Sequence, residues 1–104
     1  MEKAVEEAKE GALVSMQKFF VATMDLEKPL VLMISGGIFG VACTHSAFAD
    51  FIYCTPEAIF KTPFMTSFQS PEGGSTVTFP AMLGRRLASE MLLVDKTLTA
   101  KEAL

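Results

Sequence analysis

The sequence predicts an α/β protein, because short apolar segments suited to buried strands alternate with segments of helical periodicity. Two strand candidates, residues 30–34 and 51–54, are apolar throughout, which is typical of parallel strands covered on both faces. Hydrophobic residues make up 50% of the 104 positions. A domain of this size cannot bury them all, so some apolar surface is expected to face a partner subunit, further chain or lipid.

Residues 1–25 are predicted to form one amphipathic helix. Apolar side chains recur at three- and four-residue steps from Val5 to Met24, and charged side chains fill the opposite face. The helix is expected to stop before Pro29, because the residue that precedes a proline is pushed out of helical geometry.

The middle of the chain is predicted to alternate strands, turns and a short helix. The strand at 30–34 ends in a Ser-Gly-Gly break, and a short helix is expected over 40–49. The strand at 51–54 is followed by a Thr-Pro-Glu turn and a shorter strand at 58–60. Residues 62–74 are expected to be loop, because prolines and glycines interrupt them.

The end of the chain is predicted to be helical. Ser75 is expected to cap a brief helix that reaches about residue 83, which Pro80 would shorten or kink. Gly84 marks a joint before a firmer helix over 85–94. A capping box, Thr99 with Glu102, then starts another helix just before the last residue, which we interpret as a sign that the chain is part of a longer one.

Charge and cysteine content argue against several classes of protein. The net charge is −3 with pI ≈ 5.0 and no basic stripe, so a nucleic-acid partner is not expected. Cys43 and Cys54 form no CxxC motif and there is one His, so we expect reduced thiols and no metal. The acidic start is not a signal peptide, and the end is not a peroxisomal Ser-Lys-Leu tail.

Residues 30–49 carry no formal charge over the length of a transmembrane helix, and Gly36 with Gly40 forms a GxxxG motif. However, the Ser-Gly-Gly break, the polar residues Thr44, His45 and Ser46, and the lack of flanking basic clusters disagree with a membrane span. A strand, a glycine turn and a short helix explain the segment better, so no membrane insertion is expected.

Five motifs occur in an order and spacing that resemble one family. They are Ser-Gly-Gly-Ile-Phe-Gly at 35–40, Ala-Asp-Phe-Ile-Tyr at 49–53, Thr-Pro-Phe at 62–64, Ser-Pro-Glu-Gly-Gly at 70–74 and Leu-Thr-Ala-Lys-Glu-Ala at 98–103. From about Lys28 to Leu104, the set resembles the crotonase superfamily, and within it the peroxisomal-type Δ3,Δ2-enoyl-CoA isomerases. The resemblance implies the central part of a crotonase fold, the ClpP/crotonase-like ββα spiral.

The resemblance has departures and limits. Ser35 stands where the family usually has Asn, and Asp95 stands where it usually has Gly. A crotonase subunit is also much longer, so the first oxyanion-hole amide would precede Met1 and the helices that complete the site would follow Leu104. We therefore expect one partial domain, inactive alone, comprising the helix at 1–25, a core with the catalytic loop at 28–83, and helices at 84–104.

The resemblance places the catalytic base at Glu72. Moving a double bond from C3 to C2 of an acyl thioester requires a proton to leave C2 and one to arrive at C4. A single carboxylate within reach of both carbons can do this, while backbone amides hold the dienolate oxygen. Pro-Glu-Gly-Gly is also an ordinary exposed turn, and the motif by itself favours that reading.

Two absences favour an isomerase over a hydratase. Hydratases of the superfamily use two glutamates, and the corresponding positions here are Thr44 and Phe64, which cannot transfer a proton usefully. The nearby acids Asp50 and Glu57 are expected to be structural or solvated. The single histidine, His45, is expected to be a packed helix residue and not a base.

The resemblance also implies the remaining site residues. Val41, after Gly40, would supply the second oxyanion amide at a helix start, although a plain strand-to-helix turn explains the same letters. Phe64, Met65 and Phe68 are candidates for the acyl pocket, with ordinary core packing as the alternative.

Together these readings imply an enoyl-CoA isomerase that converts 3-enoyl-CoA to 2-trans-enoyl-CoA by a single-glutamate 1,3-proton transfer in fatty acid β-oxidation. The substrate is a fatty acyl-CoA thioester, and coenzyme A enters only as part of it, with no separate cofactor. A homotrimer in the peroxisome is implied, with the mitochondrion as the alternative compartment. The competing hypothesis is a non-catalytic crotonase-like subunit for assembly or interaction.

Overall fold

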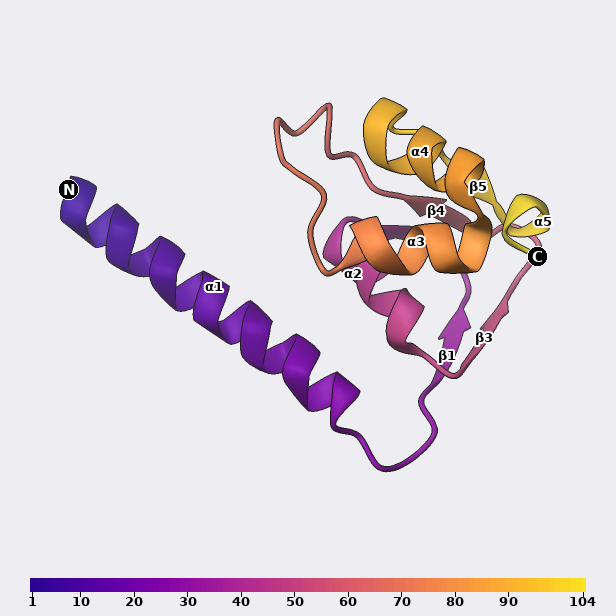
Figure 1. Ribbon diagram of the computed structural model, residues 1–104, viewed down its shortest axis with the longest axis horizontal. Coiled ribbons are helices and arrows are strands. Elements are labelled where there is room, and N and C mark those ends of the chain that lie inside the picture. Colours follow the sequence, from indigo (N-terminus) through magenta and orange to yellow (C-terminus); the bar gives the residue numbers. More distant parts are fainter.

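The computed structural model describes residues 1–104 and contains two successive strand–strand–helix units (Figure 1). The first unit comprises β1 (Val31–Ile34), β2 (Gly37–Phe39), α2 (Val41–His45) and the 3-10 turn η1 (Ser46–Phe48). The second unit comprises β3 (Phe51–Cys54), β4 (Ile59–Lys61) and α3 (Ser75–Leu83). Before them lies α1 (Glu2–Met24), and after them come α4 (Arg85–Val94), β5 (Leu98–Thr99) and α5 (Ala100–Ala103).

The two units stack through parallel strand pairing. β1 pairs with β3, with Val31 opposite Phe51, and β2 pairs with β4, with Gly37 opposite Ile59. β5 adds to β4 in the antiparallel direction. Each unit therefore repeats the path of the one before it, displaced by one strand. The predicted α/β class and the parallel strands are confirmed.

The glycine-rich segment after β1 leads directly into a second strand, β2, which the local sequence pattern does not predict. Gly37 begins β2, and flanking backbone bonds secure it: Ile59 donates to the Gly36 carbonyl at 3.3 Å, and Gly40 donates to the Lys61 carbonyl at 3.0 Å. Glycine has low strand propensity, but pairing with a neighbouring strand overrides it. The two-residue strand β5 was missed for the same reason, because it exists only through its pairing with β4.

The expectation that β1 and β3 are covered on both faces is wrong within this chain. Their sheet has only these two strands, so each has one unpaired edge. Ile34 is the only buried residue of the pair, whereas Met33 is 84% exposed and Tyr53 is 61% exposed. The apolar composition of these strands therefore exceeds what the 104 residues cover.

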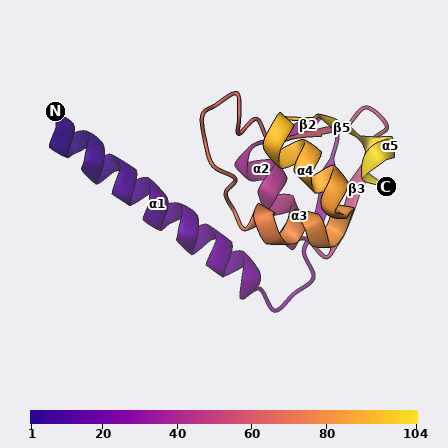
Figure 2. The same cartoon turned by 45° about the horizontal axis from the view of Figure 1, so that its top comes forward.

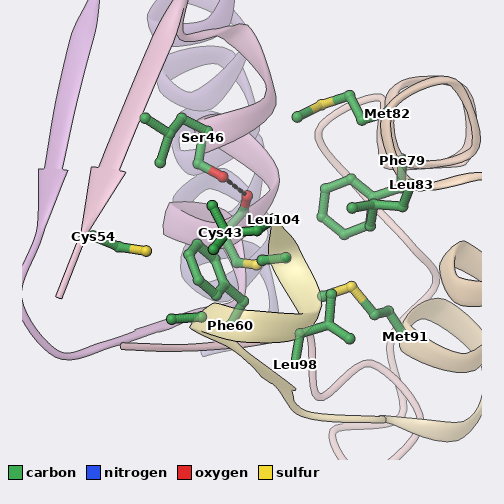
Figure 3. Close-up of a pocket in the computed structure, with 13 residues that line it drawn as sticks. Cys43, Ser46, Cys54, Phe60, Phe79, Met82, Leu83, Met91, Leu98 and Leu104 are labelled. Carbon is green, nitrogen blue, oxygen red and sulfur yellow. Dashed lines mark hydrogen bonds between the residues drawn. The ribbon is translucent and has the colours of Figure 1, made fainter. Parts of the chain in front are cut away.

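The hydrophobic core gathers buried side chains from β1, α2, β4, α3, α4, β5 and α5. Its most enclosed side chains include Phe64, Met91 and Leu98. A small apolar cavity of about 110 Å³ remains within it, and Figure 3 shows Cys43 and Cys54 on its wall. Both cysteines are free thiols, and burial raises the pKa of Cys43 to about 12.

The helix ends differ in part from the expectations. Ser75 is the first residue of α3 and not its cap; Gly74 takes the cap position with φ +72°, and the Ser75 hydroxyl donates to the Glu72 carbonyl at 2.7 Å. Pro80 does not end α3, which continues to Leu83. The joint at Gly84, with φ +78°, and the capping box at the start of α5 are confirmed.

The predicted first helix is confirmed, but most of its apolar stripe is not buried. Figures 1 and 2 show α1 leading away from the rest of the molecule, so that its N-terminal end lies far from every other element. Phe20, near the C-terminal end, is its only buried residue, whereas Leu13 is 62% exposed. No helix of the structure is both long and apolar enough to cross a lipid bilayer.

Two threonines provide a matched test of core packing. The buried Thr62 hydroxyl donates to the Met91 carbonyl at 3.2 Å, whereas the buried Thr55 hydroxyl has no partner. We expect Thr62→Val to lower the free energy of unfolding by about 1 kcal/mol and Thr55→Val to leave it unchanged or raise it, because only the first change removes a hydrogen bond. Urea denaturation measures both, and equal destabilisation would contradict this account.

Candidate active site

Glu72 lies in the loop between β4 and α3, against the buried side of α2. Its Oε1 accepts a hydrogen bond of 2.9 Å from the Thr44 hydroxyl, and Thr44 is 0% exposed. Its Oε2 is buried and has no hydrogen-bond partner. A buried carboxylate oxygen without a partner is uncommon and calls for an explanation. Here the Thr44 hydroxyl fixes one oxygen, and the other is enclosed without a bonding partner in this chain.

Gly73 allows the Glu72 loop to approach α2 this closely. It adopts φ +63°, which favours glycine. A Cβ at this position would lie 2.7 Å from the Thr44 hydroxyl and 2.8 Å from the ring of Phe20. Any side chain would therefore push the loop away from both α2 and α1, and the carboxylate of Glu72 with it.

The loop is held at both ends. At the α3 end, the Ser75 amide and hydroxyl both donate to the Glu72 carbonyl, at 3.1 Å and 2.7 Å. At the other end, the Asp95 carboxylate accepts from the amides of Met65 and Thr66 at 3.0 Å and 2.7 Å. The hydroxyl of Thr66 also donates to Asp95 and lowers the pKa of that carboxyl. Asp95, a departure from the family pattern, thus links the loop to α4.

Val41 is the first residue of α2 and borders an apolar groove. Gly40 precedes the helix with φ +54°, and the Gly40 amide donates a hydrogen bond to the Lys61 carbonyl. The Val41 amide has no acceptor in the chain. The groove has a volume of about 390 Å³, and apolar side chains of α1, β1, β2 and α2 line it together with His45. The amide is thus available at the edge of an apolar surface.

The three candidates for the acyl pocket do not share one environment. Phe64 is 1% exposed and belongs to the hydrophobic core, whereas Phe68 is 98% exposed. Met65 lies between these extremes at 42%. Their assignment to acyl binding stays a prediction.

A second apolar groove lies beside the Glu72 loop. It has a volume of about 660 Å³ and runs between α1 and α3, with Phe20, Phe48 and Val77 on its walls and Gly73 and Gly74 at one side. Local sequence patterns do not reveal this groove, because its walls come from three separate segments: α1, Phe48 and residues 73–78.

His45 fastens the C-terminal end of α1 to α2. Its Nε2 lies 2.8 Å from the Thr23 hydroxyl, and its ring stacks on Phe19 with centroids 4.3 Å apart. Phe20 completes the contact by packing against Phe48, with centroids 5.5 Å apart. Burial lowers the pKa of His45. The packed role expected for this histidine agrees with the geometry, but its contact with α1 could not be inferred from local spacing.

The other acids and possible ligands lie outside this cluster. The Asp50 carboxylate accepts from the Leu30 amide at 2.7 Å and so aligns the starts of β1 and β3, whereas Glu57 is exposed in its turn. No three His, Cys, Asp or Glu side chains come together in a geometry that could hold a metal ion.

Comparisons with known proteins lead to the same family as the five sequence motifs. Residues 2–104 match the profile of the family described as enoyl-CoA hydratase/isomerase. Enoyl-CoA delta isomerase 2 of Rattus norvegicus is 43% identical over 94% of this chain and 25% of that protein. Peroxisomal enoyl-CoA delta isomerase 3 of Mus musculus is 41% identical over 85% of this chain and 28% of that protein.

Two further matches extend the range of relatives. Testis-specific chromodomain protein Y 1 of Homo sapiens is 38% identical over 88% of this chain and 17% of that protein. The structure of a putative enoyl-CoA hydratase/carnithine racemase from Magnetospirillum magneticum AMB-1 superposes with a TM-score of 0.79 and 32% identity, covering 84% of this chain and 34% of that one. The chain spans about a quarter of the length of the curated isomerases it matches.

The two loop glycines give a matched test of the close approach. Both adopt positive φ, but a Cβ at Gly74 would meet only the Phe48 ring, at 3.9 Å. We expect Gly74→Ala to destabilise by about 1–2 kcal/mol through backbone strain. Gly73→Ala should cost about 1–3 kcal/mol more, because the methyl group overlaps Thr44 and Phe20. Denaturation curves compare the two, and equal losses would contradict the packing argument.

The contact made by His45 predicts a pH dependence. Because the folded-state pKa lies below the ordinary value of 6.5, the unfolded chain binds a proton first as the pH falls. The full stability is therefore present above pH 6.5 and is lost progressively below it. Unfolding of wild type and His45→Gln from pH 8 to pH 5 should show that the wild type loses more stability on acidification. Parallel curves would rule out this role.

Proposed function

Since this chain belongs to the enoyl-CoA hydratase/isomerase family, we propose that the protein at full length is an enoyl-CoA isomerase that converts 3-enoyl-CoA to 2-trans-enoyl-CoA. The resemblance drawn from the motifs is confirmed by the comparisons, and so is the crotonase fold. The observation that carries the proposal is the carboxylate of Glu72, with one oxygen bonded and the other buried without a partner.

In the proposed reaction, Glu72 moves one proton from C2 to C4. A carboxylate oxygen takes the C2 proton, and the electron pair of that C–H bond forms C1=C2 while the thioester oxygen takes the carbonyl pair. The same carboxyl then returns the proton to C4, the C3=C4 pair forms the new C–H bond, and C2=C3 and the carbonyl are restored. Glu72 ends as a carboxylate, so no external acid is consumed.

The dienolate oxygen needs donors during this sequence. We assign one of them to the Val41 amide, which has no acceptor in the chain and lies at a helix start beside an apolar groove. The other donor is expected from the remainder of the protein. A base and two amides suffice for the shift, so we propose that no cofactor takes part apart from the CoA of the substrate and that no metal is required.

The surroundings of Glu72 support isomerisation over hydration. Water addition in this superfamily uses two carboxylates, but Thr44 is a fully enclosed hydroxyl and Phe64 is a core side chain. Asp50 is occupied by the Leu30 amide. Glu72 contacts α2 through Thr44 and keeps one carboxylate oxygen without a partner.

We propose that the acyl chain leaves Glu72 along the groove between α1 and α3. This groove is apolar along most of its walls and begins at Gly73 and Gly74, the two residues that follow the carboxylate. Its volume of about 660 Å³ falls within the range of ligand sites in proteins. Phe64, Met65 and Phe68 remain predicted acyl-pocket residues beside this proposed path.

The setting of the reaction is proposed from the relatives. A named peroxisomal isomerase among them supports the peroxisome, with the mitochondrion as the alternative. Fatty acid β-oxidation as the pathway and the homotrimer remain predictions from the resemblance.

A non-catalytic subunit is the competing function. Testis-specific chromodomain protein Y 1 contains a segment similar to this chain, and its name does not mention an isomerase. The two functions differ in whether the carboxylate of Glu72 is needed for turnover.

The test is Glu72→Gln in the full-length protein, with Glu57→Gln as the matched control on an exposed turn. We expect the Glu72 change to lower kcat by about 10²–10⁴-fold, the usual effect of losing a general base, and the control to leave it unchanged. Formation of the conjugated thioester from 3-enoyl-CoA is followed by its absorbance. Full activity in Glu72→Gln would refute the base assignment, and an inactive but folded wild type would favour the non-catalytic subunit.

A further inference from the structure

Thr44 makes a contact that the proposed reaction does not require of it. It belongs to α2, is 0% exposed, and its hydroxyl lies 2.9 Å from Glu72 Oε1 and 3.1 Å from the Val41 carbonyl. A hydroxyl carries a single proton, so these two acceptors compete for it. The bond to an ionised carboxylate is the stronger of the two, and the proton therefore goes to Glu72.

Hydrogen bonds hold the Glu72 carbonyl and Oε1, and Oε2 is the one oxygen of this residue without a partner. Its carbonyl receives two hydrogen bonds from Ser75, and the next residue, Gly73, is seated against the Thr44 side chain. Oε1 is bonded to Thr44, whereas Oε2 is buried with no partner. A carboxylate held in this way has a single oxygen, Oε2, left to accept a proton.

We propose that Thr44 is a positioning residue that holds Oε1 of Glu72, so that Oε2 alone takes the proton from C2 and delivers it to C4. The inference rests on the proposed isomerase function. In the sequence, Thr44 is notable only because a second glutamate is missing at its position. The carboxylate then need not rotate between the two proton transfers, because the same oxygen performs both.

The hydrogen bond has a measurable signature. If Thr44 orients the carboxylate, losing its hydroxyl lowers kcat and kcat/KM equally and leaves KM nearly unchanged. A side chain that restores the donor restores the rate. A purely structural role for Thr44 would lower the free energy of unfolding and leave the kcat of the folded protein unchanged.

The experiment compares Thr44→Val, which keeps the shape and loses the hydroxyl, with Thr44→Ser, which keeps the donor. Thr55→Val is the matched control, because it removes a hydroxyl that has no partner. In the full-length protein acting on 3-enoyl-CoA, we expect Thr44→Val to lower kcat on the order of tenfold or more with little change in KM. Thr44→Ser and Thr55→Val should retain the wild-type kcat.

The outcomes separate this proposal from the function on which it rests. If wild type is active and Glu72→Gln is not, but Thr44→Val keeps the wild-type kcat, the positioning role is wrong and the isomerase stands. A loss of rate in Thr44→Ser as large as that in Thr44→Val also overturns the positioning role, and an inactive wild type overturns both proposals. Thermal unfolding checks each variant, and if Thr44→Val does not fold, Thr44→Cys replaces it, because a thiol is only a weak donor.

Discussion

The arrangement of this protein depends on how closely one loop approaches one short helix. Gly73 meets Thr44 at a distance that excludes any side chain, and the same contact brings in Phe20 from α1. Three segments distant in sequence therefore converge on a position that only glycine can occupy. The carboxylate of Glu72, the groove beside it and the docking of α1 all follow from that convergence.

Much of the fold follows from local patterns along the chain. The helices at 2–24 and 85–94 have clear periodicity, and the strands at 31–34 and 51–54 are short apolar runs between turn signals. What was missed depends on pairing between distant segments. β2 contains glycine and becomes a strand only beside β4. Gly74, and not Ser75, caps α3, because glycine can adopt the left-handed conformation found there.

The candidate site could be predicted only in part, for a related reason. A motif placed Glu72 in a loop before a helix, but its letters also describe a plain turn. The sequence marks Thr44 only as a residue that cannot transfer a proton. Nothing in its spacing predicts that its hydroxyl bonds to Glu72, 28 residues further along the chain. Asp95 likewise stood as a departure from the family pattern until its bonds to the loop were visible.

The stacking of two similar units also leaves one strand edge of this segment unpaired. β1 pairs with β3 on one side only, and its other edge presents unpaired backbone groups beside exposed side chains such as Met33. An uncovered strand edge is a template for another strand. The repetition that lets one unit pair with the next thus leaves at β1 an edge open to aggregation, in which a strand of another molecule would add to it.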